Sequence, residues 1–326
     1  MLSRVAGNIY WMARYLERAE NTARLVNVNS HLLLDLPKNM TFGWESLIAI
    51  TGCDNLFYES YKEPTERNVT KFLVGDEKNV SSILSCLAQT RENMRTSRDI
   101  IPADAWEQLN DLYLFVRNAV SNGITKRNRY DFLRKIILGC QQITGITAGT
   151  MNRDAAYNFL RMGCYLERAD MTTRILDVRS ANLLPKQSEE GSVNLSPFDN
   201  IQWMSVLKSL TAYQMYRQRM RLRVKGEDVL KFLLQDSEFP RAVSYCLSIV
   251  ETCLSGLPKN DTPLRGLGRL QRQIQSANVR ELAHHGLHEL IDELQISLGH
   301  VHDSIAVAYF GVDGSIQMQS QTQTMT

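Results

Sequence analysis

The sequence predicts an all-α fold, and three observations lead to this expectation. Apolar residues recur at steps of three and four along most of the chain, the spacing that gathers them on one face of a helix. No run of alternating apolar and polar residues lies between hairpin turns, so strands are not expected. The charged decapeptide YLERAENTAR, Tyr15–Arg24, returns as YLERADMTTR, Tyr165–Arg174. We therefore expect an internally duplicated antiparallel helical bundle with pseudo-twofold related halves.

The helical spacing defines nine segments in order along the chain. They are Ile9–Leu34, Val80–Arg95, Ala105–Val120, Tyr130–Ile143, Ala155–Leu176, Gln202–Met220, Arg241–Leu254, Leu267–Asn278 and Leu282–Tyr309. Two of the starts carry the expected signals. Pro102 and Asp104 precede the third segment, and Pro240 opens the seventh.

The repeat extends well beyond the decapeptide. Residues 8–28 and 158–178 share ten identities in twenty-one positions, at an offset of 150. Further matches follow in the same order: LPK at 36–38 and 184–186, KFL-x-x-D at 71–76 and 231–236, and Cys-Leu at 86–87 and 246–247. The offset grows from 148 to 160 across the polar stretch Gln187–Asn200, which predicts a longer loop there. We expect repeats at 1–150 and 151–311, packed as one unit, and a disordered tail at 312–326.

Composition and charge exclude several functional classes. The 326 residues carry a net formal charge of +2, which gives no broad basic surface for nucleic acid. No window approaches the ~18 uninterrupted apolar residues that a membrane span requires, and the N-terminus lacks the pattern of a signal peptide. The six cysteines form no C-x-x-C pair, which predicts buried thiols in a reducing compartment. A cytoplasmic protein without nucleic-acid or membrane partners is expected.

The repeated decapeptide places charge inside an apolar helix. On a helical wheel, Glu20 falls within the apolar stripe of the first copy, Arg24 lies one turn later, and Arg18 points nearly opposite. Asp170 and Arg174 hold the corresponding positions in the second copy. A buried carboxylate needs a partner, and an arginine at i+4 can reach it.

This pattern leaves two interpretations open. The charges either form ion pairs that fix the packing of two helices, or they line a shared polar cavity or docking face. The candidate binding residues are Glu17, Arg18, Glu20, Arg24, Glu167, Arg168, Asp170 and Arg174. The halves differ at Arg14, whose counterpart is Cys164, which argues against a strictly symmetric site.

A metal site is a weaker alternative. Glu281, His284 and His288 follow a Glu-x-x-His pattern, which is half of a di-iron carboxylate site. A second Glu-x-x-His is missing, and arginines next to the repeated carboxylates would compete with a cation. We expect no metal and no other cofactor.

Four segments resemble the bacterial alpha-E family, whose members are predicted helical proteins with an ER motif. The segments are Met1–Leu25, Thr144–Arg179, Phe232–Leu247 and Gly286–Ile305. Both ER pairs are intact, as Glu17-Arg18 and Glu167-Arg168. The resemblance implies a partner that is a circularly permuted ATP-grasp protein similar to peptide ligases, and a transglutaminase-like peptidase as a further partner. It also implies a role in making or modifying a small peptide.

The functional expectation follows from this resemblance. The leading hypothesis is an accessory protein, non-catalytic by itself, that docks the ligase or a peptide ligand through the ER-motif helices. The first alternative is an enzyme, a transferase or ligase component, that uses Glu17, Glu20, Glu167 and Asp170 as acid/base groups. The second alternative is the metal-binding helical bundle.

Overall fold

The computed structural model is all-helical over the part of the chain that it describes, residues 1–35, 43–180, 199–220, 223–283 and 285–311. The helices of the first half are α1 (Ser3–Asp35), α2 (Glu45–Thr51), α3 (Asp54–Ser60), α4 (Glu66–Val74), α5 (Ile83–Arg95), α6 (Ala103–Gly123) and α7 (Arg129–Thr150). Those of the second half are α8 (Ala155–Ser180), α9 (Asp199–Ser209), α10 (Tyr213–Met220), α11 (Gly226–Gln235), α12 (Val243–Ser255), α13 (Asp261–Ser276), α14 (Val279–Leu282) and α15 (Leu287–Tyr309).

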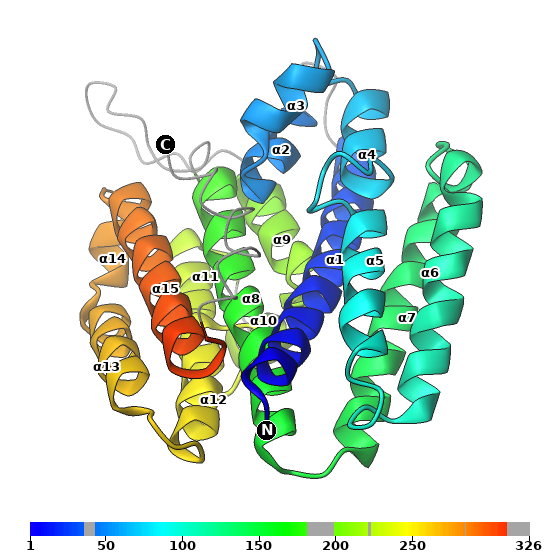
Figure 1. Ribbon diagram of the computed structural model, residues 1–326. Helices are drawn as coiled ribbons and strands as arrows, with labels where there is room; N and C mark the ends of the chain where they lie inside the picture. The colour runs from blue at the N-terminus through cyan, green and yellow to red at the C-terminus, as the bar shows by residue number, and fades with distance from the viewer. Residues whose placement is uncertain (36–42, 181–198, 221–222, 284, 312–326) are drawn as a thin grey trace.

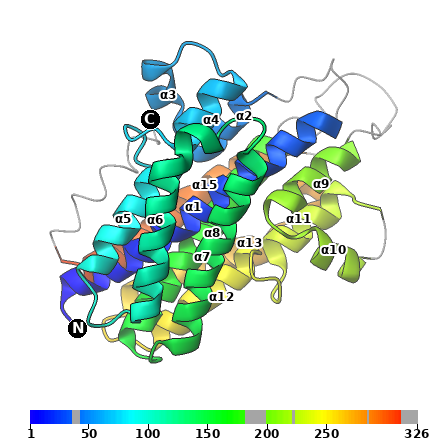
Figure 2. The ribbon, with the colours of Figure 1, turned by 90° about the vertical axis from the view of Figure 1, so that its right-hand side faces the viewer.

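Two four-helix bundles share a central seam formed by α1 and α8. Helices α1, α5, α6 and α7 close one bundle, because each packs on the next. Helices α8, α12, α13 and α15 close the other in the same way. Figure 1 shows the two bundles on either side of α1 and α8, and Figure 2 shows α5, α6 and α7 running alongside α1. The short helix α2 packs on α8, and α9 packs on α1, so each central helix is also covered by an element of the other half.

The middle of helix α1 is buried on every side. Each residue from 9 to 23 is buried, including Arg14, Glu17, Arg18 and Glu20. The expectation of a single apolar stripe, with Arg18 pointing away from it, is therefore wrong for this helix. A helix enclosed by neighbours has no solvated face, so each of its polar side chains must find a partner inside the protein.

The two central helices cross at very short range. A Cβ atom added at Gly163 of α8 would lie 2.1 Å from the backbone oxygen of Tyr10 in α1. Only glycine lets the two backbones approach this closely. The close crossing sets the spacing at which the charged side chains of the two helices meet.

Several segment boundaries differ from those predicted. The predicted helix Gln202–Met220 is divided into α9 and α10, with Thr211 between them at φ 55°. The predicted helix Leu282–Tyr309 is broken before α15 by Gly286, at φ 80°. The helices α2, α3, α4, α11 and α14 were not predicted, because segments of ten residues or fewer give too few turns for the spacing to show. The predicted tail 312–326 lies outside the described residues, as does most of the predicted loop Gln187–Asn200.

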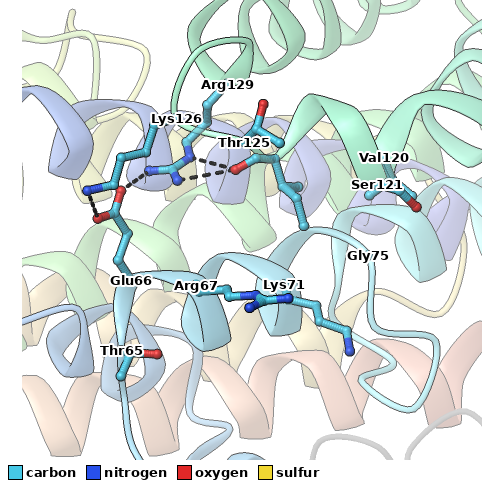
Figure 3. A pocket seen from close by; sticks show the side chains of 11 residues that line it. Thr65, Glu66, Arg67, Lys71, Gly75, Val120, Ser121, Thr125, Lys126 and Arg129 are labelled. Carbon is cyan, nitrogen blue, oxygen red and sulfur yellow. Dashed lines mark hydrogen bonds and ion pairs between the residues drawn. The ribbon is translucent and has the colours of Figure 1, made fainter.

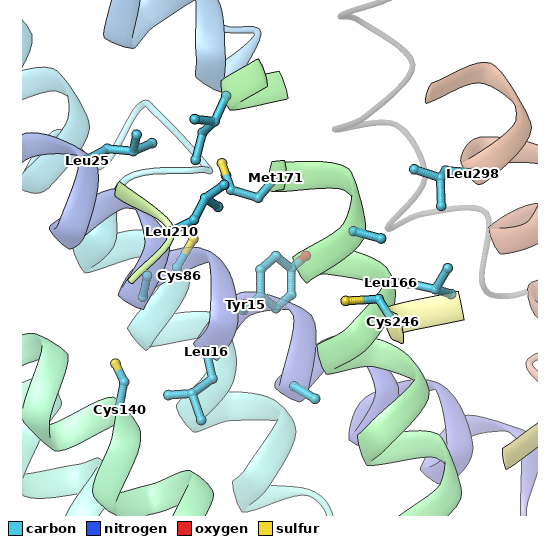
Figure 4. Close-up of a cluster of buried hydrophobic side chains, with 14 of the residues drawn as sticks. Tyr15, Leu16, Leu25, Cys86, Cys140, Leu166, Met171, Leu210, Cys246 and Leu298 are labelled. Atoms are coloured by element: carbon cyan, nitrogen blue, oxygen red, sulfur yellow. The ribbon is translucent and has the colours of Figure 1, made fainter. Parts of the chain in front are cut away.

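The apolar core runs through both bundles and includes most of the cysteines. Cys86, Cys140 and Cys246 lie among buried apolar side chains of several helices (Figure 4). All six thiols are free, and all but Cys164 are buried, as expected. Burial raises the pKa of Cys86 and Cys246 to about 12, so these thiols stay protonated. No helix in the described part of the chain has the length and apolar character needed to cross a bilayer.

Candidate functional site

The ER motif of α8 is bound by α1. Glu167 accepts hydrogen bonds from Arg18 through both carboxylate oxygens, at 2.5 Å from Nε and 3.1 Å from Nη2. Arg14, one turn earlier in α1, donates its Nε to the same carboxylate at 2.7 Å. Glu167 is 1% exposed, so this carboxylate depends on the two arginines of the other helix.

The ER motif of α1 is bound in return by the second half. Arg168 donates to both carboxylate oxygens of Glu17, at 3.1 Å and 2.8 Å. The thiol of Cys164, the counterpart of Arg14, also donates to Glu17 at 3.3 Å. The two ER motifs therefore exchange partners across the seam, glutamate to arginine in both directions.

Arg241 completes the binding of Glu17 and was not among the predicted site residues. It lies just before α12 and donates Nη1 to Glu17 at 2.9 Å and Nη2 to Glu20 at 3.2 Å. Its counterpart at the offset of 160 is Ser81, whose hydroxyl accepts a bond from Arg18 at 3.4 Å. The repeat thus places both residues beside an ER pair, and this offset was the signal in the sequence that could have identified Arg241.

The predicted i,i+4 pairs are both present. Arg24 donates Nε and Nη2 to Glu20, at 3.0 Å and 2.7 Å. Arg174 donates only Nε to Asp170, at 2.9 Å. All eight predicted site residues therefore lie around the seam, in three groups of ion pairs that together are called the ER network, and the structure adds Arg14 and Arg241 to this network. Its ion pairs join six arginines to four carboxylates.

The electrostatics of the network keep the ER carboxylates ionised. Burial alone would raise the pKa of Glu167, but Arg18 and Arg14 outweigh it and lower that pKa to about 2. Burial and the arginines act in the same opposed way on Glu17, where Arg168 and Arg241 hold the pKa well below its usual range. A carboxylate fixed in its charged form makes a poor general acid, and one enclosed by guanidinium groups makes a poor general base.

A small cavity opens beside this network, between α1, α8 and α15. Its volume is about 50 Å³. The lining residues are Arg14, Leu166, Asp170, Arg174, Gln295, Leu298, Gly299 and His302. The charged network therefore has one edge that borders an open space rather than packed protein.

A larger cavity, of about 780 Å³, lies between α4 and the connection from α6 to α7. Figure 3 shows Lys126 and Arg129 pointing toward Glu66, with Arg67 and Lys71 on the same side of α4. Lys126 and Arg129 each lie 2.8 Å from a carboxylate oxygen of Glu66. None of the residues that line this cavity belongs to the ER network.

Two of the three predicted metal residues, Glu281 and His288, lie in the described part of the chain. Glu281 accepts a bond from Asn278, and His284 lies outside the described residues. His288 instead meets Asp177, at 2.7 Å from Nδ1 to Oδ1, and Asp292. These three are the group in the described part of the chain whose atoms lie close enough for a metal ion, and two of them are exposed.

Comparison with known proteins places the chain among poorly characterised relatives. Uncharacterised proteins from Mycobacterium bovis and from two strains of Mycobacterium tuberculosis are 21% identical over 350 residues. The match covers 96% of this chain but only 38% of each relative, so the chain spans about two fifths of their length. No solved structure matches it. The model of the Alpha-E family, described as a predicted alpha-helical domain with a conserved ER motif, matches residues 1–310, and the chain therefore belongs to this family.

Proposed function

We propose that this Alpha-E protein is an accessory component of a bacterial peptide-ligase system and is not catalytic by itself. In this proposal it docks a circularly permuted ATP-grasp protein, or the peptide ligand of that protein, through the ER-motif helices. A transglutaminase-like peptidase is a further partner. The partners follow from the resemblance to alpha-E proteins. The observation that supports a role beside another protein is the length of the mycobacterial relatives, in which the matched region is 38% of a longer chain.

The geometry of the ER network favours a scaffold over a catalyst. The carboxylates of Glu17 and Glu167 are enclosed and paired, so they hold the two bundles together and cannot reach a partner. The part of the network that a partner can touch is its edge, where the side chains of Asp170 and Arg174 are 16% and 22% exposed. Docking is therefore proposed at this edge of α8, on a base that the ER pairs keep rigid.

Co-purification tests the proposal. The tagged chain is co-expressed with a circularly permuted ATP-grasp protein of the same bacterium, and the complex is isolated by affinity and size-exclusion chromatography. A complex is expected with the unaltered chain and is expected to be lost with Arg174→Glu. Arg280→Glu is the matched control, since Arg280 is exposed on α14 and outside the ER network. Failure of the unaltered chain to form a complex would refute the proposal.

The enzyme alternative stays open to a direct test. It assigns acid/base roles to Glu17, Glu20, Glu167 and Asp170, two of which the network holds ionised. If the purified chain alone joins or transfers a peptide substrate, and Glu20→Gln abolishes this turnover, the accessory role is overturned. If turnover appears only when the ATP-grasp protein is present, the accessory role stands.

A further inference from the structure

The small cavity beside the ER network contains a buried donor that lacks an acceptor. His302 of α15 is 6% exposed and lies against Tyr10 of α1, with 2.9 Å between Nδ1 and the tyrosine oxygen. The two rings stack at 14° with their centres 5.5 Å apart, which fixes the plane of the imidazole. The other ring nitrogen, Nε2, is buried and has no partner among the described residues.

The bonds around Tyr10 determine which ring nitrogen carries the proton. Burial raises the pKa of Tyr10 to about 12, so the phenol keeps its proton. Nδ1 of His302 is the hydrogen-bond partner of this hydroxyl among the described residues, so the hydroxyl hydrogen is assigned to it. Burial and the nearby Arg14 lower the pKa of His302 to about 3, so the ring is neutral. A neutral ring that accepts at Nδ1 has its hydrogen on Nε2, which is therefore a donor.

The repeat explains why a cavity exists on this side of the network. In the first half, Glu20 receives bonds from Arg24, from Arg241 and, at 3.5 Å, from Gln141 of α7. In the second half the corresponding residue is Asp170, one methylene shorter, and it receives a bond from Arg174 alone among the described side chains. The shorter carboxylate leaves space toward α15, where the cavity lies.

Because Asp170 is shorter than Glu20, it also leaves nearby hydrogen-bond donors without an acceptor. Arg24 uses Nε and Nη2 on its glutamate, whereas Arg174 uses only Nε on Asp170 and gives neither terminal nitrogen to a described residue. Gln295 of α15 is part-buried, and its amide makes no hydrogen bond with a described residue. Three donors of different kinds, a guanidinium end, an imidazole N–H and an amide, thus line one small space.

We propose that this cavity binds the carboxylate group of a small ligand, held by Arg174, His302 and Gln295. A water molecule needs a cavity of about 10–15 Å³, so about 50 Å³ admits a group of a few heavy atoms, and the remainder of the ligand extends into solvent. A carboxylate supplies the acceptors that these donors lack and suits a guanidinium end. The negative charge of Asp170 is offset by Arg174, and Arg14 adds a positive charge at the cavity wall. This site stands on the cavity alone and does not depend on the proposed ligase partner.

Ligand titration of the isolated chain tests the site. N-acetylglycine, which ends in a carboxylate, is compared with N-acetylglycinamide, which has the same shape without the charge. Binding is followed by calorimetry and by the ¹⁵N signals of His302. We expect N-acetylglycine to bind and to shift those signals, and the amide to leave them unchanged. Equal binding of both compounds, or no binding of N-acetylglycine at millimolar concentration, overturns the proposal.

Variants locate the binding. Arg174→Gln should weaken the binding of N-acetylglycine at least about tenfold, which is typical of losing one charge-assisted hydrogen bond. Arg280→Gln, the same change at an exposed arginine of α14 outside the ER network, should leave the affinity unchanged. Gln295→Leu removes a neutral donor without stranding a charge, so it tests the site even if Arg174→Gln destabilises the fold. Acetate is the third ligand to be compared. If acetate binds more weakly than N-acetylglycine, the carboxylate that the site recognises is that of a peptide end. If the two bind equally, the site recognises a free acid. Unchanged affinity in both Arg174→Gln and Gln295→Leu contradicts the proposal.

Discussion

Glu167 of α8 and Arg18 of α1 face each other across the centre of the protein and share two hydrogen bonds. The pair is matched by Glu17 and Arg168, with the roles of the helices exchanged. The two-letter ER motif therefore has a physical meaning that neither copy has alone. The two copies form reciprocal ion pairs between two buried helices, and each copy supplies the charge that the other copy requires. These ion pairs, Glu167 with Arg18 and Glu17 with Arg168, are called the lock below.

Removing one charge from this lock should be costly. Glu167→Gln keeps the shape of the side chain but leaves Arg14 and Arg18 buried without their carboxylate, which should lower the free energy of unfolding by about 3 kcal/mol. Urea denaturation measures the change. Glu92→Gln is the control, because it breaks an exposed pair with Arg95 and should leave the unfolding midpoint where it is. Equal effects of the two changes would mean that the lock contributes no stability.

The stability that the ion pairs of Glu167 contribute should also be lost in acid. The pKa of Glu167 is about 2 in the folded protein and 4.5 when unperturbed, so the unfolded state takes up this proton first as the pH falls. The contribution of Glu167 to stability is therefore complete above pH 4.5 and is lost progressively toward pH 2. Unfolding free energies measured across this window should show a slope that is smaller in Glu167→Gln. An identical slope in both proteins would assign the acid sensitivity to other groups.

Gly163 should be intolerant of any side chain. Alanine there would place its Cβ against the backbone oxygen of Tyr10, and a backbone atom cannot move aside without separating α1 from α8. We expect Gly163→Ala to destabilise the protein by about 1–3 kcal/mol. Gly145→Ala is the matched control in α7, where a Cβ meets no other atom, and it should stabilise by about 0.5–1 kcal/mol. Thermal unfolding of the two variants should shift in opposite directions.

The histidines should divide into two classes when titrated. Burial, assisted by Arg14, lowers the pKa of His302 to about 3, so its NMR signals should not move between pH 5 and pH 8. His288 is exposed and bonded to Asp177, which raises its pKa, so it should titrate above pH 6.5. Histidine-selective NMR measures both in one sample. Titration of His302 near neutral pH would contradict the buried, neutral imidazole on which the assignment of the Nε2 hydrogen is based.

His302 also gives a stability prediction with a defined sign. Its pKa is lowered on folding, so the unfolded state gains a proton before the folded state as the pH falls from 6.5 to 3. Stability should decline through this window by up to about 1.4 kcal/mol per pH unit. In His302→Phe, which keeps the ring stack on Tyr10, the decline should be reduced. A variant with the same pH profile would contradict the buried neutral state.

The long helices and the pairs within them follow from the sequence, because both depend on spacing along one helix. Glu20 with Arg24, and Asp170 with Arg174, needed only the i,i+4 rule. The exchange between Glu17 and Arg168 did not follow, because a helical wheel describes one helix and does not show which neighbour covers each side. It assigned Arg18 to the wrong environment for that reason.

Residues that reach the site from outside α1 and α8 were the hardest to predict. Arg241 reaches Glu17 across 224 positions, from a segment that belongs to no helix. His302 was noted in no candidate set, because a lone histidine on a helix carries no pattern that distinguishes a buried donor from a solvated ring. The cavity at Asp170 depends on a difference of one methylene between two copies of a motif, which is visible in the sequence but has no meaning until α15 is placed beside it.

The exchange of partners across the seam has a consequence for any shorter version of the molecule. A polypeptide ending at Thr150 would retain Glu17 and Arg18 but lose Arg168 and Glu167, the groups that neutralise them. Such a fragment could restore both pairs by associating with a second copy of itself, since each copy presents one glutamate and one arginine in the required order. We therefore expect a fragment of residues 1–150 to form a homodimer in which both pairs are restored.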